Sequence, residues 1–256
     1  MIKFFRKIRQ RLLTENKFSK YLLYAIGEII LVVIGILIAL QINNWNEARK
    51  ERLEEREILS DLQLDIRVDI EKINYQLDFK KEMISNYRNC LEILADKKEA
   101  SKSEFMEGFK SILQVGDVSL NTTTFNNLQT TGDIRLIKNK TLANSIVNYY
   151  NTDLVSWQSA LREYTRNITA PYVLNFDYIP QNTYEDSRNN LLIMPGKPKD
   201  FKNPGKTLDD YKEDYFIINT LRQKTWNIEA LLLRYSDLLD YAKNLDKAIQ
   251  KHLDNQ

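Results

Sequence analysis

The longest apolar run of the chain covers residues 21–42, and Glu28 is the one charged residue within it. As an α-helix, these twenty-two residues would rise about 33 Å, enough to cross a bilayer hydrocarbon core of about 30 Å. Residues typical of membrane–water interfaces flank the run: Lys20, Tyr21, Tyr24 and Trp45. The pattern therefore predicts a transmembrane helix over residues 21–42.

Two other interpretations of this run are weaker. A cleaved signal peptide needs small residues after the apolar stretch, and Ala39-Leu40-Gln41 offers only one. A buried core helix of a soluble protein rarely contains an unbroken apolar stretch of this length. An uncleaved signal-anchor explains the run best.

Basic residues are unequally distributed around the run. The first twenty residues carry seven Lys or Arg against one acidic residue, a net charge of +6. The four basic residues that follow closely stand among acidic neighbours: Arg49, Lys50, Arg52 and Arg56. The positive-inside rule then makes residues 1–20 a basic cytoplasmic tail and places residues 43–256 outside the cytoplasm.

One face of the predicted membrane helix combines small residues with an ionisable one. Its members recur at steps of three or four: Ala25, Glu28, Val32, Gly35 and Ala39. Gly35 and Ala39 form a small-xxx-small pair that permits close approach of a second helix. We expect this face to pack against another transmembrane helix, from a second copy or a partner. The alternative is that Glu28 only reaches toward the interface and Gly35 is incidental.

Two long amphipathic seams lie beyond the membrane segment and predict helices over about 47–97 and 210–252. The first seam steps by threes and fours, with Lys80 as its one misfit: Leu59, Leu62, Ile66, Ile70, Ile73, Leu77, Ile84, Tyr87, Leu91 and Leu94. The second repeats the same spacing: Ile228, Leu231, Tyr235, Leu238, Ala242, Leu245 and Ile249. Burying these seams against each other, or against a neighbouring chain, would supply the main stabilising term.

Shorter helices are expected over residues 103–170, with Asn139 as an N-cap of one of them. Residues 171–207 contain all five prolines and little periodicity, so we expect a long loop excursion there. Its aromatic cluster is a candidate ligand cleft or partner contact: Tyr172, Phe176, Tyr178 and Tyr184. The expected fold class is all-α, with one N-terminal transmembrane helix followed by an extracytoplasmic helical bundle.

Composition argues against several kinds of chemistry. Residues 21–256 carry 30 basic and 34 acidic side chains, so nucleic-acid binding is not expected. The single histidine, His252, is expected to be solvated near the chain end, and the single cysteine, Cys90, to be a small core residue. Asp61, Asp65 and Asp69 could gather a cation, but a solvated helix face explains them better. We therefore expect no catalytic residues, no cofactor and no metal.

Several segments together resemble a group of uncharacterised bacterial membrane proteins defined by a domain of unknown function. They are Phe4-Phe5-Arg6-Lys7-Ile8-Arg9, the stretch from Gly27-Glu28 to Ala39-Leu40-Gln41-Ile42, and Asn43-Asn44-Trp45-Asn46. Residues 128–139 (LQTTGDIRLIKN), followed by Tyr149-Tyr150, are similar to the external core pattern of that group. The resemblance implies a bacterial inner-membrane protein and brings no activity with it.

Three functions are compatible with these features. The first is an anchored helical scaffold or accessory subunit of the bacterial envelope, which binds a protein partner or its own copy through the membrane helix and external bundle. The second is a sensory or ligand-binding module acting through a partner, because a cytoplasmic tail of some twenty residues is too short for an output domain. The third, an enzyme, would have to rely on carboxylates, tyrosines or serines.

Overall fold

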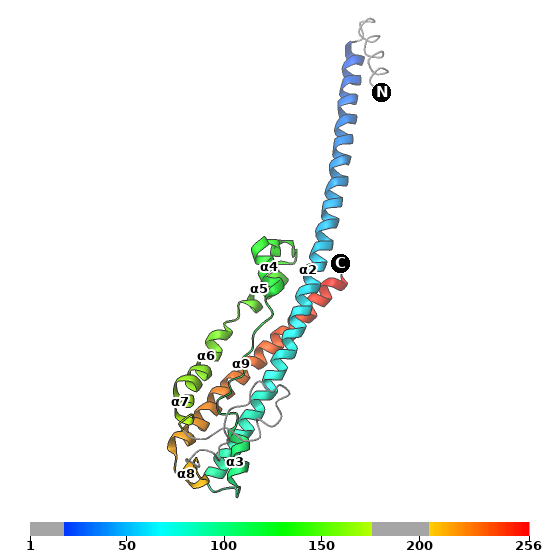
Figure 1. Ribbon diagram of the computed structural model, residues 1–256. Coiled ribbons are helices and arrows are strands. Elements are labelled where there is room, and N and C mark those ends of the chain that lie inside the picture. Colours follow the sequence, from blue (N-terminus) through cyan, green and yellow to red (C-terminus); the bar gives the residue numbers. More distant parts are fainter. Residues whose placement is uncertain (1–17, 176–204, 256) are drawn as a thin grey trace, which may run out of the picture. The chain divides into compact units, whose positions relative to one another are not determined.

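The computed structural model describes residues 18–175 and 205–255, with the side chains of Leu22 and of Ala25 onward in the first helix. Every regular element in these residues is a helix, which confirms the expected all-α class. The chain divides into two compact units, Met1–Glu57 and Ile58–Gln256 (Figure 1). A single long helix, α2 (Phe18–Leu94), contributes residues to both units.

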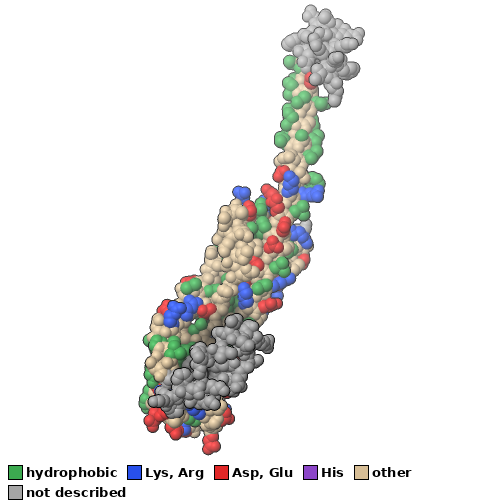
Figure 2. Space-filling model, in the orientation of Figure 1, with side chains coloured by type: hydrophobic (Ala, Val, Ile, Leu, Met, Phe, Trp, Pro, Cys, Tyr) green, Lys and Arg blue, Asp and Glu red, His purple; other side chains and the backbone are tan. Residues whose placement is uncertain are grey.

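In the first unit, α2 exposes its apolar side chains instead of burying them. Ile29 is 63% exposed, Leu31 68% and Ile42 62%, and Figure 2 shows this apolar surface in green. Among the described residues, α2 is the one helix long and apolar enough to cross a membrane. Exposed apolar surface of this extent is unfavourable in water and favourable in a bilayer.

The second unit holds the remaining helices, most of them short. They are α3 (Lys102–Phe109), α4 (Thr123–Thr131), the 3-10 turn η1 (Asp133–Leu136), α5 (Lys140–Tyr150), α6 (Leu154–Tyr164), the π-helical turn η2 (Thr165–Thr169), α7 (Ala170–Val173), α8 (Leu208–Lys212) and α9 (Tyr215–Asp254).

Local capping explains where several of these helices begin. Ser101 and Glu104 form a reciprocal capping box at the start of α3. The side chain of Asn139 accepts a hydrogen bond from the Leu142 N–H, which confirms it as the N-cap of α5. Asp214 caps α9 by accepting from the N–H groups of the second and third residues after it.

α9 lies antiparallel against the part of α2 that belongs to the second unit (Figure 1). Near one end, Gln63 donates to the carbonyl oxygen of Asp246 at 3.2 Å, and near the other, Arg88 pairs with Glu229 at 2.6 Å. The two apolar seams meet in the core between these helices, and α5 and α6 also pack on α9. Since the ion pair is largely exposed, the buried seam carries most of the stabilisation.

Candidate functional site

The most unusual feature of the second unit is an irregular segment, residues 110–122, that joins α3 to α4. Four carbonyl oxygens of this connection accept hydrogen bonds from buried lysines: those of Ile112, Gln114, Val115 and Gly116. Backbone carbonyls outside helices and strands must find donors when they are buried. We call these carbonyls, together with Lys80 and Lys224, the buried lysine centre.

Lys80 reaches the connection from α2. Its side chain is wholly buried, and its Nζ donates to the carbonyl oxygens of Val115 and Gly116, each at 2.6 Å. The ring of Tyr235 lies beneath the ammonium at 5.6 Å, a cation–π distance. Burial lowers the pKa of Lys80 to about 8, although the negative charge of Asp117 opposes this effect.

Lys224 approaches from α9 and is also wholly buried. Its Nζ donates to the carbonyl oxygen of Ile112 at 2.5 Å, to that of Gln114 at 3.2 Å and to the hydroxyl of Thr165 at 2.9 Å. Three acceptors match the three N–H groups of an ammonium. Burial, together with the nearby positive charge of Lys80, lowers the pKa of Lys224 to about 7.

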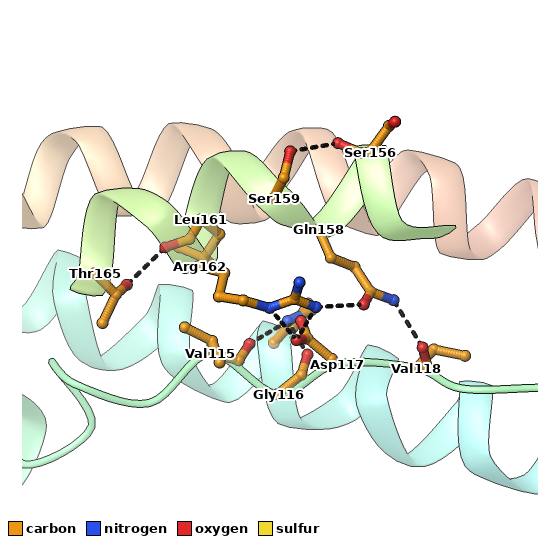
Figure 3. A network of polar contacts seen from close by, with 11 residues as sticks. Val115, Gly116, Asp117, Val118, Ser156, Gln158, Ser159, Leu161, Arg162 and Thr165 are labelled. Atoms are coloured by element: carbon orange, nitrogen blue, oxygen red, sulfur yellow. Dashed lines mark hydrogen bonds and ion pairs between the residues drawn. The ribbon is translucent and has the colours of Figure 1, made fainter. Parts of the chain in front are cut away.

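The end of the connection is tied to α6 through Asp117 and Val118 (Figure 3). Arg162 Nη2 donates to Asp117 Oδ2 at 2.6 Å and also to Gln158 Oε1 at 3.3 Å. Gln158 in turn donates to the Val118 carbonyl oxygen at 2.8 Å. Three helices therefore hold the connection by polar contacts: α2 and α9 through lysines, and α6 through Gln158 and Arg162.

In this arrangement the two lysines act as structural donors. Both ammonium groups are closed off from solvent and bound to backbone carbonyls, so neither faces a substrate in the described state. Sequence reasoning noticed Lys80 as a misfit on the first seam and did not single out Lys224. Extending the second seam backwards through Leu221 and Ile217 would have found Lys224 by the same signal, a lysine at a core position.

A second polar cluster corrects the interpretation of the aspartate stripe on α2. Asp69 is wholly buried: its Oδ1 accepts from the Asn121 N–H at 2.8 Å, and its Oδ2 accepts from the Tyr149 hydroxyl at 3.2 Å. Asp65 is half-buried and accepts from the Asn121 side chain at 2.6 Å. The expectation of a solvated face was wrong for these two residues and holds only for exposed Asp61.

Hydrogen bonds and a nearby cation offset part of the cost of burying the charge of Asp69. Burial raises the pKa of Asp69, while the Asn121 N–H, Lys72 and Tyr149 oppose that shift. Its hydrogen bonds join α2 to α5 and to the end of the connection. The cluster is therefore a second set of polar contacts that holds the connection between α3 and α4 in place. No group of ligating side chains suited to a metal ion occurs in the part of the chain that the structure describes.

The predicted membrane-packing face lies in the first unit with no other described element upon it. Val32 is 54% exposed, and a Cβ placed on Gly35 would meet no atom within 4 Å. Ala39 is exposed, whereas Ala25 and Glu28 are half-exposed. Trp45 is 60% exposed, and the side chains of Lys20, Tyr21 and Tyr24 lie outside the described residues.

The predicted aromatic loop is described only at Tyr172, because Phe176, Tyr178 and Tyr184 lie outside the described residues. The ring of Tyr172 stacks on Phe216 with centroids 3.9 Å apart, and its hydroxyl donates to Asp214 at 2.8 Å. The structure thus joins Tyr172 to the start of α9, which sequence spacing did not reveal.

The single cysteine and the single histidine both lie on long helices of the second unit. Cys90 is wholly buried, as expected for a small core residue, and burial raises the pKa of its thiol to about 12. His252 lies in the last turn of α9, near the end of the chain, and is partly exposed. A buried, protonated thiol is a poor nucleophile in this state.

Comparison with known proteins places the chain in a family without assigning a function. Residues 28–158 match a family described as a family of unknown function, DUF6090. No curated protein and no solved structure matches the chain. Since the match covers just over half of the 256 residues, it confirms the expected membership of an uncharacterised family, and the protein belongs to the DUF6090 family.

Proposed function

We propose that this protein is a single-pass membrane protein of the bacterial envelope whose helical second unit binds a protein partner as a scaffold or accessory subunit. One observation carries the proposal: the apolar side chains of α2 between Ile29 and Ile42 are exposed along a helix of membrane-spanning length. Residues 58–256 form a separate compact unit with a core of its own. This division suits a domain that is tethered by an anchor and binds a partner.

The orientation of the anchor gives a first prediction. Seven basic residues precede the span, so a reporter that is active only outside the cytoplasm should be active when fused after Gln256. The fusion should also stay in the membrane pellet after alkaline extraction, which releases peripheral proteins. As a control, the same reporter fused before Met1 should be inactive. A silent C-terminal fusion in intact membranes would overturn the topology, and release at alkaline pH would overturn the anchor.

The packing face gives a second prediction, which concerns the partner. Replacing both Glu28 and Gly35 with leucine should reduce the yield of a specific amine-crosslinked species in membranes about threefold to tenfold, because interhelical polar and small-residue contacts contribute about 1 kcal/mol. The matched control replaces Ile30 and Ile34, on the opposite face, with leucine and should leave the yield unchanged. Equal yields in both variants would show that this face does not pack.

A second candidate is a ligand-binding module that signals through a partner. The observation in its favour is a groove of about 570 Å³ between α2 and α9, whose lining includes Ile84, Leu232 and the Arg88–Glu229 ion pair. Affinity purification after membrane crosslinking separates the two functions. One stoichiometric protein partner supports the scaffold, whereas a co-purifying small molecule supports the ligand-binding module.

A further inference from the structure

The ammonium group of Lys206 sits among aromatic rings and a carboxylate near the start of α9. Its Nζ lies 5.2 Å from the centroid of the Tyr172 ring and 5.7 Å from that of the Tyr211 ring. Asp214 forms an ion pair with the same nitrogen. Two ring faces and one carboxylate are the groups that recognise an alkylammonium ion in proteins.

Besides their contacts with Lys206, the two rings of this site have packing partners of their own. Tyr211, on α8, is wholly buried and packs against Phe105 and Phe109 of α3, with ring centroids 4.9 and 5.6 Å away. Tyr172, on α7, is backed by the stacked ring of Phe216. Figure 1 shows α7 and α8 at the end of the unit where α9 begins. Both rings are therefore held by aromatic neighbours in addition to the ammonium.

The Asp214 carboxylate is also positioned by hydrogen bonds from the backbone at the start of α9. Asp214 Oδ1 accepts from the N–H groups of Phe216 at 3.0 Å and Ile217 at 3.2 Å, while Oδ2 faces Lys206 and the Tyr172 hydroxyl. Burial opposes the charge, but the hydrogen bonds from Lys206, Tyr172 and the Ile217 N–H outweigh it and lower the pKa of Asp214. An ionised, preorganised carboxylate is therefore present at neutral pH.

Lys206 is more exposed to solvent than the carboxylate with which it pairs. It precedes the N-cap of α8, outside any helix, and its side chain is 24% exposed, against 6% for Asp214. We propose that Tyr172, Tyr211 and Asp214 form a recognition site for an alkylammonium group. Lys206 of the same chain occupies this site, and an external ammonium group displaces it. The external group is the side chain of a lysine in another protein or a free alkylamine. All three residues belong to the second unit, and the site does not depend on the proposed function.

Replacing Lys206 with alanine should open the site to a small probe. In the full chain in detergent, n-butylammonium chloride should raise the Tm of Lys206→Ala by about 3 °C at tenfold excess over its Kd, relative to equal sodium chloride. The wild type should need at least about tenfold more probe, because the tethered lysine competes at an effective concentration in the millimolar range. Butanol, which lacks the charge, should have no such effect.

Two further variants make the test specific. Lys206→Ala combined with Asp214→Asn should lose the response to butylammonium. Lys212→Ala removes a lysine of α8 that pairs only with surface aspartates among the contacts described for it, and it should gain no response. Should Lys206→Ala fail to fold, Lys206→Ser is measured in its place. A folded variant whose Tm does not respond to butylammonium beyond the sodium chloride control would overturn the site.

The source of the ammonium is distinguished by a second probe, N-acetyl-lysine N-methylamide. Tighter binding of this derivative than of butylammonium to Lys206→Ala would assign the site to lysines of another protein, since the probe offers the same stem with peptide groups at its base. Equal or tighter binding of butylammonium would assign it to free alkylamines. Either result supports the site, whereas binding of neither probe overturns it.

Discussion

Replacing Gly116 with alanine is expected to lower the free energy of unfolding by about 2–4 kcal/mol, or the Tm by about 5–15 °C. Gly116 has a φ of +60°, a conformation that costs an L-residue about 1 kcal/mol or more. A Cβ there would also lie 2.6 Å from Gln76 Oε1 and 2.7 Å from the Phe79 ring. Relieving that overlap moves the Gly116 carbonyl away from Lys80, which donates to it at 2.6 Å. Thermal unfolding of the full chain in detergent, followed by circular dichroism, measures the effect.

Gly132 supplies the matched control for this substitution. It also has a positive φ, +77°, and ends α4, but a Cβ on it would meet no atom within 4 Å. Gly132→Ala should therefore lower the free energy of unfolding only by the cost of a positive φ for an L-residue, about 1 kcal/mol. If both substitutions lower the free energy of unfolding by the same amount, Gly116 packs less closely against α2 than the structure indicates. A larger loss at Gly116 attributes the difference to its packing against α2.

The helical class and the long apolar helix were predictable because their signals are local. A run of apolar residues or a seam at steps of three and four depends only on neighbours within a few turns. Capping residues such as Asn139 carry their signal within three positions. The periodicity of α2 also crosses the end of the apolar run without Gly or Pro, and the structure shows one uninterrupted helix from Phe18 to Leu94.

The buried polar clusters were not predictable because their partners are distant or lack a side-chain signature. Lys80 and Lys224 bind backbone carbonyls, and any residue type offers a carbonyl. Asp69 depends on partners 52 and 80 residues away, so its spacing from other aspartates on α2 gave a misleading signal. A polar residue on an apolar seam indicates that a partner exists, but only the fold shows which one.

The two lysines give the second large expected effect, a dependence of stability on pH. The pKa of Lys224 is lowered to about 7 from its usual 10.5, so between these values the unfolded chain binds the proton that the folded chain has released. The free energy of unfolding should therefore rise with pH from about 7 upward, by about 1 kcal/mol per pH unit from this group. Lys80, with a pKa of about 8, adds to the rise at the upper end of the range. The measurement stops near pH 8, before the Cys90 thiol and the tyrosines of the unfolded chain ionise. Folding raises the pKa of that thiol, so its ionisation in the unfolded chain would lower the free energy of unfolding as pH rises further.

Replacing Lys224 with methionine should flatten that rise by about 1 kcal/mol per pH unit. The charged and titratable groups that face the centre come from every surrounding element, namely Lys80 on α2, Asp117 on the connection, Arg162 on α6 and Tyr235 on α9. All of these remain in the variant, so a change of slope reports Lys224 itself. Lys243→Met, at an exposed position of the same helix, should leave the slope intact. A wild-type stability that is level or falling between pH 7 and 8 would show that Lys224 stays protonated in the folded chain. In that case its three acceptors, not its burial, would determine its charge.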